Sequence, residues 1–123
     1  MENQWWQGQP VLEVAVGGNI TTREQAFTLS KTIVDDIEAS HYPHVIVILD
    51  LSKLGQSPNA ASLIGGNLPQ TNKIEHLVMI NAPMLFRMAT MPLVHLRDKL
   101  HFLGNPAAAK VKAQELLPRL PKL

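Results

Sequence analysis

The chain has 123 residues, close to the commonest size of a single domain and enough to bury one hydrophobic core. Eleven Lys and Arg against ten Asp and Glu leave a net charge of +1, and the charges are spread along the sequence. Proteins that bind nucleic acid usually carry a basic patch or stripe, so we expect no nucleic-acid partner. The hydrophobic share of 46% is that of an ordinary folded protein and argues against a disordered chain.

The sequence contains no cysteine, which excludes a disulfide framework, a thiolate metal site and a Cys nucleophile. Residues 1–9 are polar with two Trp and do not have the pattern of a signal peptide. No apolar stretch approaches the roughly 20 residues that a membrane-spanning helix needs. We therefore expect a cytoplasmic protein without a membrane span.

The first elements predicted are two strands. Apolar residues from Val11 to Val16, interrupted only by Glu13, predict a strand. The Trp5–Trp6 pair before it suggests a short strand that pairs back on the first.

A long amphipathic helix is expected next. Thr21 and Glu24 have the spacing of a capping box, in which each side chain bonds a free amide of the first turn. The helix is predicted to end near His41, before a proline. Its buried face is expected to carry Ala26, Leu29, Ile33 and Ile37.

The continuous β-branched run over residues 44–50 is typical of a central strand buried on both faces. A loop is expected to follow, and Ser57-Pro58 then predict the start of a weak helix. Residues 77–80 predict another strand, followed by a Met-rich helix that starts at Pro83 and ends at about Thr90. Residues 100–103 predict a last strand, and Asn105 is expected to cap a final helix over 107–117.

Strands that alternate with helices through short connections predict an α/β fold with a mainly parallel sheet and right-handed crossovers. In such sheets, functional groups lie just beyond the carboxyl ends of the strands. Here those positions are residues 17–22, 50–59, 81–83 and 104–106.

Two short motifs, read with this element order, resemble the STAS domain. "VGGNIT" precedes the first helix, and "ILDLSKL" ends the central strand. STAS is the fold of bacterial anti-anti-sigma factors and of the cytoplasmic tails of sulfate transporters. The resemblance implies a single STAS-like domain over 1–123, with a core at about 11–117. It also implies a mainly parallel sheet of four to five strands and about four helices.

The sequence departs from the family at its phosphorylation motif. Family members that a kinase modifies carry Asp-Ser-Ser-Gly at the start of the second helix, where this chain has Pro58-Asn59-Ala60-Ala61. Ser57 and Ser62 flank that position without matching it. The sequence is therefore expected to belong to a divergent STAS-like protein and gives no support for kinase-switched partner exchange.

No catalytic, metal or cofactor motif can be assembled from the sequence. Gly17-Gly18-Asn19 lacks the spacing of a dinucleotide or P-loop motif and is expected to form a tight turn. The five histidines have no metal-ligand spacing, and no Ser has an evident His partner. Asp50, at a strand's carboxyl end, and Asn19 are expected to organise loops. We expect no enzyme, cofactor or metal.

The segment of residues 84–91 is apolar almost all round, so it is either deeply buried or exposes an adaptable Met surface. Our preferred hypothesis is a non-enzymatic regulatory or protein-interaction module that binds a protein partner or itself, for example as a homodimer. The alternative is a carrier of a small hydrophobic, lipid-like ligand between the sheet and the third helix. The expected partner or ligand surface comprises Ser57, Asn59, Ser62, Met84, Arg87, Met88 and Met91.

Overall fold

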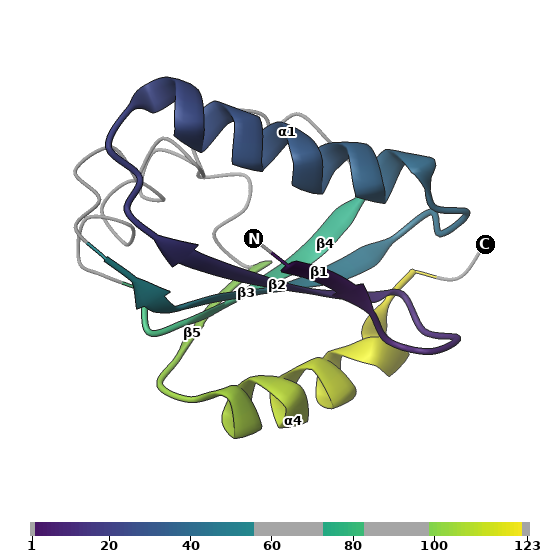
Figure 1. Ribbon diagram of the computed structural model, residues 1–123. Coiled ribbons are helices and arrows are strands. Elements are labelled where there is room, and N and C mark those ends of the chain that lie inside the picture. The colour runs from purple at the N-terminus through teal and green to yellow at the C-terminus, as the bar shows by residue number, and fades with distance from the viewer. Residues whose placement is uncertain (1, 56–72, 83–98, 122–123) are drawn as a thin grey trace.

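The computed structural model of the protein describes residues 2–55, 73–82 and 99–121. These residues form a five-stranded sheet between two α-helices (Figure 1). In chain order the elements are β1 (Glu2–Trp5), β2 (Val11–Gly18), α1 (Arg23–Ala39), β3 (Val45–Leu54), β4 (Ile74–Ile80), β5 (Leu100–Leu103) and α4 (Pro106–Leu116). A single 3-10 turn, η3 (Leu117–Arg119), follows α4.

The sheet is mixed, because it joins four parallel strands to one antiparallel edge strand. The strands follow one another across the sheet in the order β1-β2-β3-β4-β5. β2 to β5 pair in parallel, whereas β1 pairs antiparallel to β2, with Trp5 opposite Leu12. The link between β1 and β2 is too short for a crossover and permits only antiparallel pairing. This hairpin turns the mainly parallel sheet expected from the sequence into a mixed one.

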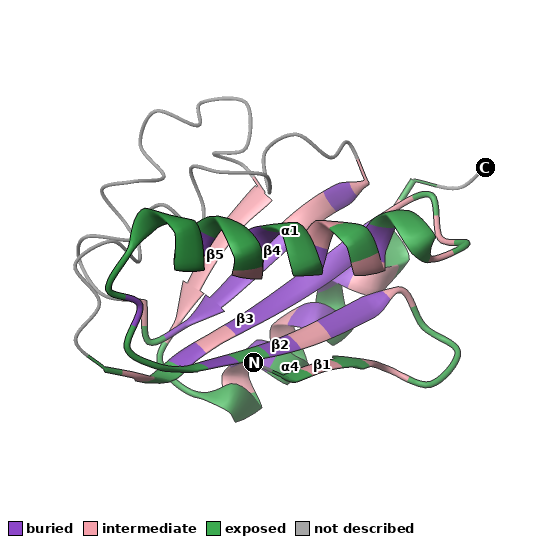
Figure 2. Cartoon of the chain, turned by 45° about the horizontal axis from the view of Figure 1, so that its top comes forward, coloured by how far each residue is buried: buried purple, intermediate pink, exposed green. Residues whose placement is uncertain are grey.

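The centre of the fold is β3, which is covered on both faces. Its residues Val45–Leu49 are all buried, as the continuous apolar run predicted. Side chains alternate along a strand, so Val47 and Leu49 pack under α1, whereas Ile46 and Ile48 pack under α4. Figure 2 shows the buried strands beneath α1, whose outer surface is exposed.

The helix α1 begins one residue later than its sequence motif suggested. Thr22, not Thr21, is the N-cap: its hydroxyl accepts a hydrogen bond of 3.1 Å from the backbone N–H of Gln25. The Gln25 side chain in turn accepts from the Thr22 backbone N–H at 3.2 Å, which completes the capping box. The predicted Thr21–Glu24 box is therefore wrong by one position, because two overlapping pairs of residues have the required spacing.

Other element ends also differ from the sequence-based prediction. β3 extends to Leu54 through residues expected to be a loop, because residues 53 and 54 pair with Gly17 and Gly18 at the end of β2. β4 starts at Ile74, three residues before its predicted start, where it pairs with Val45. The final helix begins at Pro106, and its predicted cap, Asn105, is confirmed by a 2.8 Å bond from the Ala108 N–H.

Of the roughly four helices expected, the described residues contain two, α1 and α4. The helices predicted to start at Ser57 and Pro83 lie outside the described residues. Neither of the two described helices is long and apolar enough to cross a membrane.

Replacing Thr22 by Ala should lower the free energy of unfolding by about 1 kcal/mol, because the N-cap hydroxyl is lost. Thr21→Ala is the matched control and should cost less, since the Thr21 hydroxyl bonds the Gln25 side chain at 3.2 Å, whereas the Thr22 hydroxyl caps a backbone N–H. Urea denaturation monitored by circular dichroism measures the free energy of unfolding of both variants. An equal or larger loss for Thr21→Ala would contradict the assignment of Thr22 as the cap.

Candidate functional site

The carboxyl ends of β2, β3, β4 and β5 lie at one edge of the sheet, because these strands are parallel. At this edge residues 19–22 lead from β2 into α1, and α4 begins immediately after β5 (Figure 1). Ligand-binding groups in parallel α/β sheets are commonly found at such an edge. It is therefore the first place to look for a functional site.

Three polar side chains from two neighbouring strands meet at this edge. One carboxylate oxygen of Asp50, Oδ1, accepts hydrogen bonds from both the backbone N–H of Ser52, at 2.9 Å, and its hydroxyl, at 2.6 Å. The Ser52 Oγ accepts a third bond, at 3.0 Å, from the side-chain amide of Asn81. Asn81 also donates its backbone N–H to the carbonyl of Leu103, so the network extends to β5.

The position of Asn81 depends on an unusual backbone conformation. Its φ of 54° lies in the left-handed region, which Asn tolerates better than most residues. This turn at the end of β4 places its amide over Ser52. The polar network is thus held by local backbone geometry as well as by its own hydrogen bonds.

A second contact at this edge joins the residues that follow β3 to the end of β2. The backbone N–H of Gly55 donates to the carbonyl of Gly18 at 2.7 Å. The Asn19 side chain packs directly on Gly55: a Cβ at that position would lie 2.0 Å from Asn19 Oδ1. A side chain at position 55 would therefore displace the Asn19 amide from this position.

A small cavity of about 160 Å³ lies next to the network, on the face of the sheet that α4 covers. Three carboxylates and one ammonium group border it, from Glu2, Glu13, Asp50 and Lys110. Its volume is well below the roughly 300–1,000 Å³ of sites for drug-sized ligands. The lipid-carrier alternative placed its ligand against the third helix, which lies outside the described residues, so this cavity under α4 neither supports nor tests it.

A pair of histidines lies near the other edge, toward the amino ends of β4 and β5. The Nδ1 atom of His76 is 3.2 Å from Nε2 of His101. Burial is the main cause that lowers the pKa of each imidazole below its ordinary 6.5. For His76, the Glu75 carboxylate raises the pKa in part, and the cations of Lys99, Lys112 and Arg119 lower it further. For His101, the neighbouring His76 and Lys112 add to the lowering.

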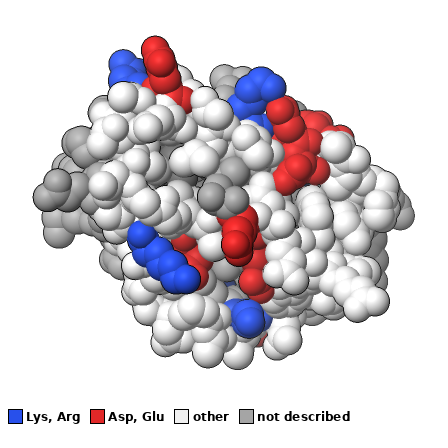
Figure 3. Space-filling view, viewed as in Figure 1, with Lys and Arg blue, Asp and Glu red and all other residues white. Residues whose placement is uncertain are grey.

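Glu75, which precedes His76 in β4, forms two ion pairs of its own. Its carboxylate lies 2.9 Å from Nδ1 of His44 and 3.4 Å from Nζ of Lys99. Within residues 2–55, 73–82 and 99–121, no three His, Asp or Glu side chains come close enough to hold a metal ion together. On the face seen in Figure 3, acidic and basic side chains lie in small mixed groups, and no single basic patch dominates it.

Two of the predicted site residues, Asp50 and Asn19, are among the described residues and lie at the carboxyl edge, and their loop-organising role stays a prediction. The other predicted surface residues, Ser57, Asn59, Ser62, Met84, Arg87, Met88 and Met91, lie outside the described residues.

Sequence reasoning missed Ser52 and Asn81 as partners of Asp50, and His76 as a partner of His101. The Asp-x-Ser spacing, which favours a local side-chain to backbone bond, is a signal that could have predicted part of the network. Nothing in the sequence indicated the histidine pair.

Comparison with known proteins identifies the fold. No known family model matches the chain, and no curated protein matches it by sequence. A solved structure of an uncharacterised DUF3478-family protein from Shewanella loihica, described as having a SpoIIAA-like fold, matches with a TM-score of 0.59. The match has 14% sequence identity and covers 91% of this chain and 90% of that chain. The SpoIIAA-like fold is the STAS, or anti-anti-sigma factor, fold, so the fold expected from the resemblance is confirmed.

Gly55→Ala should lower the free energy of unfolding by about 1 kcal/mol, because its methyl group would collide with the Asn19 side chain. The loss should shrink in an Asn19→Ala background, where the colliding oxygen is absent. Chemical denaturation of the wild type, the two single variants and the double variant measures the coupling free energy between residues 19 and 55. Equal losses in both backgrounds would show that Asn19 does not pack on Gly55.

Acidification should destabilise the protein through His76 and His101. Because folding lowers the pKa of both imidazoles, the unfolded chain binds more protons than the folded chain at acidic pH. Their contribution to the free energy of unfolding therefore keeps its full value above pH 6.5 and decreases as the pH falls below it. Denaturation between pH 7.5 and 5 should show a shallower pH dependence for His101→Gln than for the wild type. His41→Gln, at an exposed position, is the control and should keep the wild-type slope. A His101→Gln slope as steep as that of the wild type would contradict this origin.

Proposed function

We propose that this STAS-fold chain is a non-enzymatic regulatory module that acts by binding a protein partner or a second copy of itself. The observation that carries the proposal is the network of Asp50, Ser52 and Asn81 at the carboxyl edge of the sheet. It presents exposed polar groups in fixed positions, with their hydrogen bonds directed toward one another. Polar groups held in fixed positions can form hydrogen bonds with the surface of a protein partner.

The same network argues against catalysis at this edge. The Ser52 hydroxyl is the candidate nucleophile of this network, and its hydrogen-bond partners are a carboxylate and an amide. Neither partner is the histidine that most often serves as the general base for such a hydroxyl. The described histidine pair lies on β4 and β5 toward their amino ends, away from this hydroxyl.

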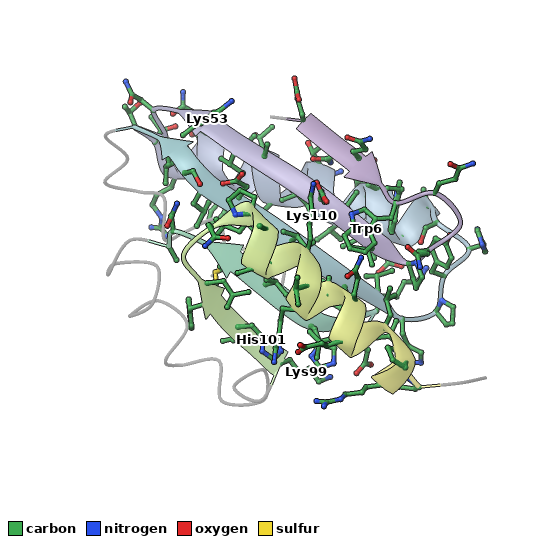
Figure 4. The ribbon with its side chains drawn as sticks, turned by 90° about the horizontal axis from the view of Figure 1, so that it is seen from below. Trp6, Lys53, Lys99, His101 and Lys110 are labelled. Carbon is green, nitrogen blue, oxygen red and sulfur yellow. The ribbon has the colours of Figure 1, made fainter. Side chains whose placement is uncertain are left out.

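The binding surface that we propose joins the described edge to the segments predicted from the sequence. The described part consists of Asn19, Asp50, Ser52, Lys53 and Asn81. In Figure 4, Lys53 lies at the end of β3 that carries this edge. The predicted part comprises the residues around Ser57 and the Met-rich segment, which follow β3 and β4 directly in the sequence.

Charge reversal at this edge should weaken binding. In affinity purification with quantitative mass spectrometry and in sedimentation velocity, Asp50→Lys and Lys53→Glu should each reduce partner recovery or self-association at least threefold. Lys53→Glu leaves the Asp50 network intact and so separates surface charge from local structure. Met88→Asp should have the same effect if the Met-rich segment belongs to the surface.

Glu115→Lys is the matched control for Asp50→Lys, because it makes the same change in charge on an exposed residue at the far end of α4. It should bind as the wild type does. The proposal fails if all these variants behave alike, or if the wild type stays monomeric and recovers no partner above the level of an unrelated bait protein. Far-UV circular dichroism checks that each variant is folded.

A further inference from the structure

His76 and His101 stand side by side on one face of the sheet. Two residues further along each strand, Val78 and Leu103 pack into the cluster beneath α4. Because side chains alternate along a strand, both histidines face the α4 side as well. In Figure 4, His101 and Lys99 lie on one side of α4, whereas Lys110 and Trp6 lie on the other. The pair is therefore separate from the acidic cavity and from the carboxyl edge.

The distance between the two ring nitrogens has the size expected for two ligands of one metal ion. The Nδ1 atom of His76 and the Nε2 atom of His101 are 3.2 Å apart, and the ring centroids are 5.3 Å apart. With Zn–N bonds of about 2.0–2.1 Å, this separation gives an N–Zn–N angle of about 100–106°, near the tetrahedral value. We propose that His76 and His101 form a two-histidine site for a divalent transition-metal ion of the zinc, nickel and copper class.

Metal binding requires that each ligating nitrogen be free of its proton. In the metal-free pair, one of the two facing nitrogens carries the proton of their hydrogen bond. When that ring adopts its other neutral tautomer, both facing nitrogens expose lone pairs, and the metal takes the place of the proton. Both rings are half-buried, and metal binding requires a rotation of the rings that makes the two lone pairs converge on one point.

The charges around the pair modulate the site in opposite directions. Lys99, Lys112 and Arg119 place positive charge near His76, which weakens the binding of any cation. The Glu75 carboxylate counters this effect, although it is already close to His44 and Lys99. Imidazole ligands suit zinc, nickel and copper, whereas magnesium and calcium prefer oxygen ligands. The bonds to nitrogen therefore set which metals bind, and the nearby cations set how tightly.

Isothermal titration of the full chain with Zn²⁺ at pH 7.5 tests the site. The wild type should bind one ion, and His76→Gln and His101→Gln should each weaken binding at least tenfold. Lys112→Gln should tighten binding about twofold or more, because it removes a nearby positive charge without touching a ligand. His41→Gln, on an exposed residue, is the control and should bind as the wild type does.

A spectroscopic measurement on the unaltered protein keeps the test independent of the folding of the variants. In long-range ¹H–¹⁵N spectra, Zn²⁺ should shift the signals of Nδ1 of His76 and Nε2 of His101 together. The proposal is overturned if either histidine can be replaced without loss of affinity, if the two nitrogens do not shift, or if no saturable binding is seen. None of these results depends on the carboxyl edge, so failure here leaves the proposed interaction function standing.

Discussion

The burial of β3 on both faces is the constraint on which the rest of the structure depends. Five consecutive apolar side chains, Val45–Leu49, point alternately to opposite sides of the sheet, and all are removed from water. Each side must therefore be covered by another layer, and the described helices α1 and α4 provide one layer each. Both edges of β3 must also be paired, which β2 and β4 accomplish in parallel. At about 25 cal/mol per Å² of buried apolar surface, this double coverage is the main favourable contribution to folding.

Parallel pairing around β3 gives the sheet two chemically different edges. At the carboxyl edge, Asp50, Ser52 and Asn81 satisfy one another's hydrogen bonds and form a preorganised polar surface. Near the other edge, His76 and His101 face each other, and Glu75 bridges toward His44 and Lys99. The two groups of side chains lie at different ends of the strands. A partner at one edge and a metal ion at the other would therefore not compete directly for the same atoms.

Much of the fold could be predicted because its signals are local. The buried run of β3, the amphipathic face of α1 and the Asn105 cap of α4 each depend on residues within a few positions of one another. Element ends were less predictable. The tandem Thr21-Thr22 and Glu24-Gln25 allow two capping boxes, and only the entry of the chain into α1 selects Thr22. Similarly, β3 continues to Leu54 because the end of β2 pairs with it, which no local pattern encodes.

The sequence by itself determined the alternation of strands and helices, the central strand, and the motifs that resemble the STAS fold. It also predicted that Asp50 and Asn19 lie beyond the carboxyl ends of strands. Only the tertiary structure decided which side chains meet there and elsewhere. Ser52 and Asn81 are 29 residues apart in the chain, and His76 and His101 are 25 apart. Their contacts depend on the register between neighbouring parallel strands, and that register is specified by the burial of apolar faces across the sheet rather than by any short stretch of sequence.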